Sequence, residues 1–123
     1  MRGINMSINL NLIKETRDKR LDELRALERE LYSSKVQLFW EQNGTDAEKE
    51  EFIRERDDIV LSRIKLENTI LENIAGRLKE LEGSLNDGIN NLKQEIANLN
   101  NTMNFLNAIF RVTGILARIL LLV

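Results

Sequence analysis

The chain has 123 residues, with 18 basic and 20 acidic side chains and with no proline, cysteine or histidine. Without cysteine and histidine, disulfides, thiol chemistry and the usual zinc sites are excluded, and the commonest acid–base catalyst is missing. The slight negative charge argues against nucleic-acid binding, because proteins that bind phosphate backbones usually carry a basic surplus. The absence of proline and the helix-forming composition predict an all-α protein. We expect it to have no enzymatic activity, no cofactor, no metal and no small-molecule substrate.

Residues 1–6 are expected to form a disordered leader. The segment up to Leu12 has no sustained apolar core and no small-residue cleavage site, so no cleaved secretory signal is predicted. A first helix is predicted over residues 7–42, with Ser7 as its N-cap and with leucines spaced by threes and fours.

A turn is predicted over residues 43–46. Gly44 suits the left-handed conformation that ends many helices, and either Thr45 or Asp46 can cap the helix that follows. Because the turn is short, the second helix should return antiparallel to the first and form a helical hairpin.

The second helix is predicted over residues 47–100 as a coiled-coil helix, because apolar residues recur there at heptad spacing. Residues 83–88 contain two glycines and an Asn-Asp pair, and they leave two predictions open. Either one long helix is bent or broken at this point, or a loop here produces a three-helix bundle. The apolar series keeps its phase through this segment, with one stutter, and this favours the long helix. The later part of this apolar series is the predicted oligomer seam, which consists of Leu92, Ile96, Leu99, Met103 and Leu106.

Residues 101–123 are predicted to form an apolar C-terminal helix. No acidic residue follows Glu95, and the polar side chains after it fall at spacings that place them on one stripe of a helix. The stripe consists of Asn104, Asn107, Arg111 and Arg118. The rest of the circumference is apolar, which predicts burial by lipid or by neighbouring subunits. The predicted contact residues are Phe105, Ile109, Phe110, Leu116, Leu120 and Leu121.

A long charged coiled coil joined to a short apolar helix resembles, in architecture alone, the subunits of helical pore-forming proteins. This resemblance implies a self-assembling protein that acts at a membrane through its C-terminal helix. An arginine in the middle of a membrane span costs at least about 2.5 kcal/mol, which disfavours a single isolated span. The alternative is a soluble coiled-coil scaffold or adaptor, in which the same helix is the core of an oligomer or docks on a helical partner.

Overall fold

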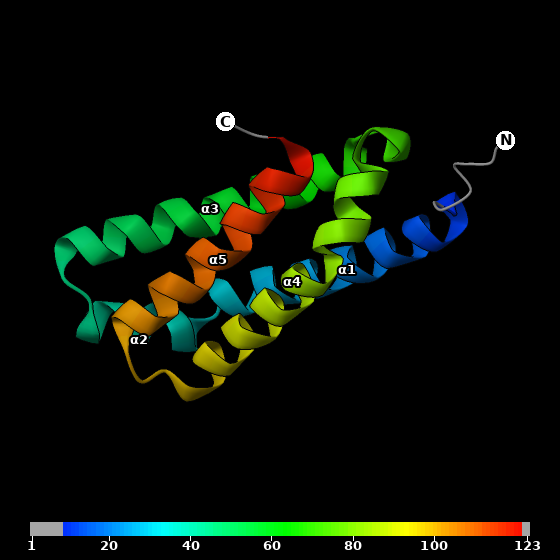
Figure 1. The fold of residues 1–123 in the computed structure, drawn as a ribbon. Helices are drawn as coiled ribbons and strands as arrows, with labels where there is room; N and C mark the ends of the chain where they lie inside the picture. Colours follow the sequence, from blue (N-terminus) through cyan, green and yellow to red (C-terminus); the bar gives the residue numbers. More distant parts are fainter. Residues whose placement is uncertain (1–8, 122–123) are drawn as a thin grey trace, which may run out of the picture.

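The computed structural model describes residues 9–121 of the chain (Figure 1). Within that range the secondary structure is helical, which confirms the predicted all-α class. The helices are α1 (Leu10–Leu31), α2 (Ser34–Asn43), α3 (Asp46–Asn68), α4 (Leu71–Asn98) and α5 (Thr102–Leu120). The predicted leader and the predicted cap Ser7 lie outside the described residues. Asn9 is the N-cap of α1, since its side-chain oxygen accepts hydrogen bonds from the backbone of Asn11 and Leu12.

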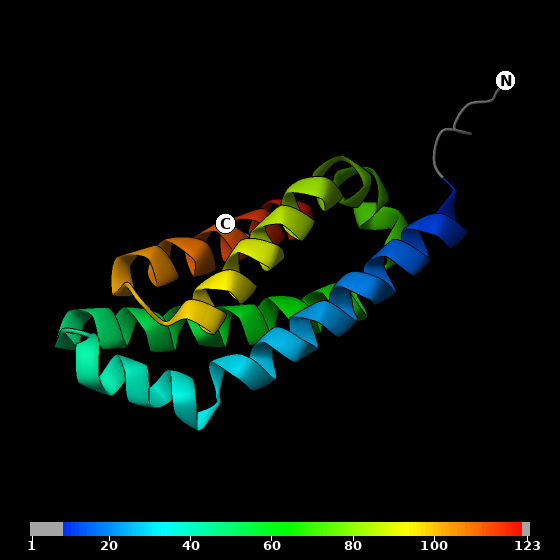
Figure 2. The same ribbon diagram turned by 90° about the horizontal axis from the view of Figure 1, so that it is seen from below.

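The predicted first helix, residues 7–42, is interrupted after Leu31. The Ser33 hydroxyl donates to the carbonyl of Glu30 and accepts from the backbone N–H of Val36. Serine side chains compete with the helical backbone for hydrogen bonds in this way, so Ser33 ends one helix and caps the next. The prediction of one continuous helix is therefore wrong, although α1 and α2 run in the same general direction (Figure 2).

The predicted turn between α2 and α3 is confirmed, together with its capping residue. Thr45 accepts from the backbone of Glu48, and the Glu48 carboxylate accepts from the backbone of Thr45, which completes a capping box. Gly44 is not left-handed, because its φ is −87°. A Cβ atom at Gly44 would lie 2.9 Å from the Trp40 ring, so close approach to that ring is what favours glycine here.

The prediction of a single helix over residues 47–100 is wrong, because the chain leaves the helix at Thr69 and Ile70. Both residues have extended backbones, with ψ of 151° and 124°. They are β-branched, and such residues favour extended conformations over helix. The predicted bend or loop at 83–88 does not interrupt the helix, since α4 stays helical from Leu71 to Asn98. A Cβ atom added at Gly88 would lie 3.5 Å from Val112, in ordinary van der Waals contact, so this glycine lies against α5.

The helices form a bundle in which α1 and α4 run in one direction and α3 and α5 in the other (Figures 1 and 2). Helix α1 packs against α3 and α4, and α5 packs against the same two helices from the opposite side. The predicted hairpin is present as α1 and α2 followed by the antiparallel α3. The connection at residues 69–70 then crosses to the far corner of the bundle, and α4 and α5 form a second hairpin.

The heptad series predicted for α4 is confirmed as its buried face. Its apolar residues pack against α1 and α5 of the same chain, so own-chain helices fill the place that a coiled-coil partner would take. The series in α3 is different. Ile53 and Ile64 continue the heptad spacing into α3, but they are 47% and 38% exposed. The buried residues of α3 are instead Phe52, Ile59, Ser62 and Leu66.

Candidate interaction surface

Helix α5 is a core helix of this bundle. Phe105, Ile109 and Leu116, which were predicted to meet lipid or a neighbouring subunit, are at most 1% exposed and are covered by the chain itself. This corrects the prediction for these three residues, because α3 and α4 of the same chain cover the side of the helix on which they lie. The buried residues of α5 are Phe105, Leu106, Ala108, Ile109, Val112, Ile115, Leu116 and Ile119.

Both ends of α5 are anchored. At its start, Phe105 lies in a cluster of aromatic rings, with ring centroids 5.4 Å from Trp40 and 5.7 Å from Phe52. Aromatic pairs at such distances add stabilisation beyond the burial of their area. At its end, the Arg77 guanidinium of α4 donates to the backbone carbonyl of Ile119 at 2.8 Å. This bond satisfies one of the carbonyls that a helix C-terminus leaves without a partner.

The predicted polar stripe is on the outside of the bundle. Asn104, Asn107, Arg111 and Arg118 are all exposed. Neither arginine forms an ion pair with any side chain in residues 9–121. The stripe therefore carries two positive charges that the bundle itself does not neutralise.

The remaining predicted contact and seam residues divide between the core and the surface. Phe110 and Leu121 are 39% and 64% exposed, and Leu120 is half-buried against the core. Met103 is exposed as well. The seam residues Leu92, Ile96 and Leu106 are buried inside the chain, and Leu99 is half-buried.

A groove of about 410 Å³ lies between the parallel helices α3 and α5. Its apolar lining includes Leu61 of α3, which is 54% exposed, and Phe110 of α5. Gly114 and Ala117 of α5 line it as well. Apolar side chains exposed side by side on two helices form a contiguous surface of the kind that marks interaction sites. We call this surface the outer α3–α5 face.

The α3 half of this face was not among the predicted contact residues, but it has a signal in the sequence. Leu61 is an apolar residue that falls outside the single helical stripe of the buried Ile59 and Leu66. A helix that carries more apolar residues than one stripe can hold has a second apolar face. That excess is the signal that predicts the α3 half.

Carboxylates border the α3 side of the groove. The Thr113 hydroxyl of α5 donates to Glu55 at 2.8 Å, and Asp58 lies beside it in the groove lining. Burial raises the pKa of Glu55; the hydrogen bond from Thr113 opposes this shift, and the negative charges of Asp58 and Glu51 add to it. Lys65 lines the same groove and Arg54 pairs with Glu51, so the carboxylates Glu51, Glu55 and Asp58 outnumber the cations of the α3 edge by one.

Most of the other acidic residues near the start of α3 have partners within the chain. Glu48 belongs to the capping box, Glu51 pairs with Arg54 at 2.8 Å, and Asp57 accepts from the Tyr32 hydroxyl. Within residues 9–121, no three carboxylates converge in a geometry that would hold a metal ion.

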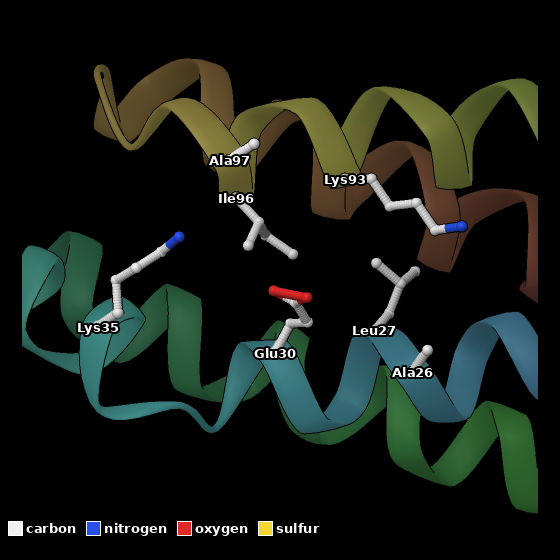
Figure 3. Close-up of a pocket in the computed structure, with 7 residues that line it drawn as sticks. All are labelled: Ala26, Leu27, Glu30, Lys35, Lys93, Ile96 and Ala97. Carbon is white, nitrogen blue, oxygen red and sulfur yellow. The ribbon is translucent and has the colours of Figure 1, made fainter.

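A second hollow, of about 290 Å³, lies between α4 and the end of α1 (Figure 3). Leu27 and Ile96 face each other across it, and Lys35 reaches toward Glu30 at one end. The Lys93 amine points away from Glu30. This hollow has an apolar floor and mixed charges, and its lining contains no serine, threonine or tyrosine that could serve as a nucleophile.

Within the described residues, α5 is the one helix that is long and apolar enough to cross a membrane, with a mean hydropathy of 1.3. Almost half of the segment, 44%, is buried inside the bundle. Core helices of bundles pass the same length and hydropathy criteria.

Comparisons with protein-family models, with curated proteins and with solved structures find no match for this chain.

Proposed function

We propose that this protein is a non-enzymatic helical scaffold that self-associates through its outer α3–α5 face. The observation that carries the proposal is the juxtaposition of Leu61 and Phe110, two large apolar side chains exposed on adjacent helices around one groove. Burying such a pair in a contact would stabilise an assembly by roughly 25 cal/mol for each Å² of apolar area removed from water.

The two hollows of the bundle do not differ in the number of charged residues that line them. Glu30, Lys35 and Lys93 line the α1–α4 hollow, and Glu55, Asp58 and Lys65 line the α3–α5 groove. What favours the α3–α5 face is the pair of large apolar side chains exposed on its two helices. The α5 side of this face also carries asparagines, which hydrogen-bond across an interface without the cost of removing an ion from water.

A second candidate function is membrane association through α5. The length and hydropathy of this helix favour it, and so do the two unpaired arginines on its outer stripe, which could contact lipid phosphates. This function requires α5 to leave the bundle, because most of its apolar residues are buried against the other helices. Each large side chain that is released exposes surface worth about 1.5–3 kcal/mol, and lipid must replace that contact.

The first experiment measures the mass of the full chain by multi-angle light scattering in detergent-free buffer over a range of concentrations. We expect an oligomer of defined mass that Leu61→Lys dissociates. The matched control is Leu12→Lys, since Leu12 is 59% exposed on α1, at the α1–α4 side of the bundle. A chain that stays monomeric at all concentrations, or two variants with equal masses, would contradict the proposal.

Flotation of the full chain with anionic liposomes tests the membrane candidate. Removing α5 is not informative, since the rest of the bundle would lose its core. A disulfide between Gly88→Cys and Val112→Cys can instead tie α5 to α4, because these positions are in contact and the natural chain has no cysteine. If the protein acts by releasing α5, the reduced protein floats and the oxidised protein does not.

A further inference from the structure

We infer that the outer α3–α5 face binds a second copy of this chain in a parallel two-fold dimer, in which the two α5 helices lie side by side. This inference rests on the proposed self-association and adds its geometry. Three features of the face lead to it: the spacing of the α5 residues at its centre, one asparagine among them, and the charges on its two borders.

The outer face of α5 carries a heptad series of its own. Its members are spaced alternately by four and three residues and, apart from Ala117, which is half-buried, they are exposed on the bundle surface. The series is Met103, Asn107, Phe110, Gly114, Ala117 and Leu121. Alternating spacing of this kind is the pattern of a seam between two helices that pack along their length. The buried residues of α5 lie on the opposite side of the helix, so the helix has two apolar seams.

The small residues in this series permit close helix packing. A Cβ atom added at Gly114 would meet no other atom within 4 Å, so the space beside it is open to a second molecule. Gly114 and Ala117 are adjacent members of the series, between Phe110 and Leu121. Two helices approach closely where small residues face each other, and the larger residues on either side then close the ends of the contact.

Asn107 identifies the orientation of the two helices. In heptad notation Phe110 and Ala117 take position d, and Asn107 takes position a. A single asparagine at an a position specifies register and favours a parallel dimer, because each side-chain amide then pairs with its own copy. In an antiparallel contact the two asparagines would lie apart, each opposite an apolar residue.

The charges on the borders lead independently to the same orientation. Three members of the polar stripe, Asn104, Arg111 and Arg118, take the e positions of this heptad, so the two arginines border the seam on the side away from α3. The opposite border is α3, where Glu51, Glu55 and Asp58 outnumber the cations Arg54 and Lys65. A two-fold axis parallel to the helices places the basic border of each copy against the acidic border of the other. An axis across the helices would place like charges together.

The expected ion pairs follow from the positions of these residues along the two helices. Arg111 and Arg118 are seven residues apart, and so are Glu51 and Asp58. In a parallel coiled coil, a residue at an e position contacts the preceding g position of the partner helix. Thr113 takes the g position that precedes Arg118, and its hydroxyl bonds to Glu55. Arg118 of one copy therefore meets Asp58 and Glu55 of the other, and Arg111 meets Glu51.

Cysteine cross-linking of the full chain tests this geometry, because any introduced thiol is the only one present. Residues at the centre of a parallel seam face their own copies, so Gly114→Cys should form a symmetric disulfide-linked dimer under mild oxidation. The matched control is Gly83→Cys, a helical glycine on α4 that also has open space around it. This variant should run as a monomer in non-reducing gel electrophoresis. Equal cross-linking of both variants would overturn the inference.

A charge exchange provides the second test. Arg118→Asp and Asp58→Arg, each alone, place like charges across the seam and should weaken the dimer about tenfold or more. The double variant restores opposite charges and should recover most of the affinity in sedimentation equilibrium. Circular dichroism of each variant checks that the bundle still folds, which is expected because both residues are exposed. No recovery in the double variant contradicts the parallel arrangement.

The outcomes separate this inference from the proposed function. An oligomer that Leu61→Lys dissociates, but that shows no Gly114→Cys cross-link and no charge rescue, overturns the parallel geometry and leaves self-association through this face supported. A full chain that is monomeric at every concentration overturns both. A dimer with a Gly114→Cys cross-link and charge rescue supports both.

Discussion

The inner and outer faces of α5 have similar residue spacing and very different composition. The inner line consists of large apolar residues, Phe105, Ile109, Val112, Leu116 and Ile119, each at most 1% exposed. The outer line includes an asparagine, a glycine and an alanine, and its large residues are 39–64% exposed. Tight burial of large side chains stabilises the fold, whereas small and polar residues on an exposed line suit a reversible contact. One face of the helix thus stabilises the fold, and the other carries the proposed contact between copies.

The largest expected effect distinguishes the two phenylalanines of this helix. Phe105→Ala removes a buried ring from the aromatic cluster and should lower the free energy of unfolding by about 3–5 kcal/mol. Phe110→Ala, on the outer face, should lower the value for the monomer by less than about 1 kcal/mol. Urea unfolding followed by Trp40 fluorescence measures both, since Trp40 contacts Phe105. Equal losses would show that the two faces do not differ as described.

A pair of glycine substitutions examines the same contrast. Gly88→Leu places a large side chain where even an added Cβ atom would lie 3.5 Å from Val112, and this overpacking should cost about 1–3 kcal/mol. Gly114→Leu meets open space on the outer face and should leave the monomer as stable or stabilise it by up to about 1 kcal/mol through helix propensity. Thermal unfolding at a concentration that keeps the chain monomeric measures the two effects. A loss of stability in Gly114→Leu would contradict the assignment of an open outer face.

A smaller effect is expected from the bond that anchors the end of α5. Arg77→Met removes the hydrogen bond to the carbonyl of Ile119 and should cost about 1–2 kcal/mol, because that carbonyl is partly buried. Arg118→Met is the control on the outer face, with an expected change within about 0.5 kcal/mol. Hydrogen exchange should show faster exchange of the last amides of α5 in Arg77→Met alone. Unchanged exchange there would mean that Arg77 does not hold the helix end.

The smallest effect concerns pH. Burial raises the pKa of Glu55 above its usual value of 4.5, so the folded state binds the proton more tightly than the unfolded state does. The stability that this proton contributes is fully present below the unfolded pKa and is lost as the pH rises through the folded pKa. Glu55→Gln removes this dependence, so its stability should fall less than that of the natural chain between pH 4 and pH 7. Unfolding midpoints at the two pH values test this, and parallel pH profiles would contradict it.

Local signals in the sequence predicted much of the architecture. The capping box at Thr45, the apolar face of α4 and the exposed stripe with Arg111 and Arg118 all follow from spacing and residue type within one helix. The break at Ser33 was missed because a mid-chain serine is compatible with either a helix or a cap. The break at Thr69 and Ile70 was missed because the heptad series continues on both sides of it.

The division of the C-terminal residues between core and surface could not be predicted from local signals. Phe105 and Phe110 are both apolar members of the same helix, and only the position of α3 and α4 around α5 decides that Phe105 is buried and Phe110 is exposed. The excess of apolar residues in α3 indicates a second apolar face, but only the pairing of α3 with α5 decides which helix completes it. Such tertiary contacts join residues that are far apart in the chain, so periodicity within one helix does not reveal them.

The most direct test of the two-faced helix measures mass and stability of Phe110→Lys together, by light scattering in detergent-free buffer and by thermal unfolding. The charged side chain should abolish self-association and leave the helical content and the monomer's unfolding midpoint close to those of the natural chain. The result that would contradict the account is a variant that keeps the natural chain's oligomeric mass, or one that loses its fold as Phe105→Ala is expected to do.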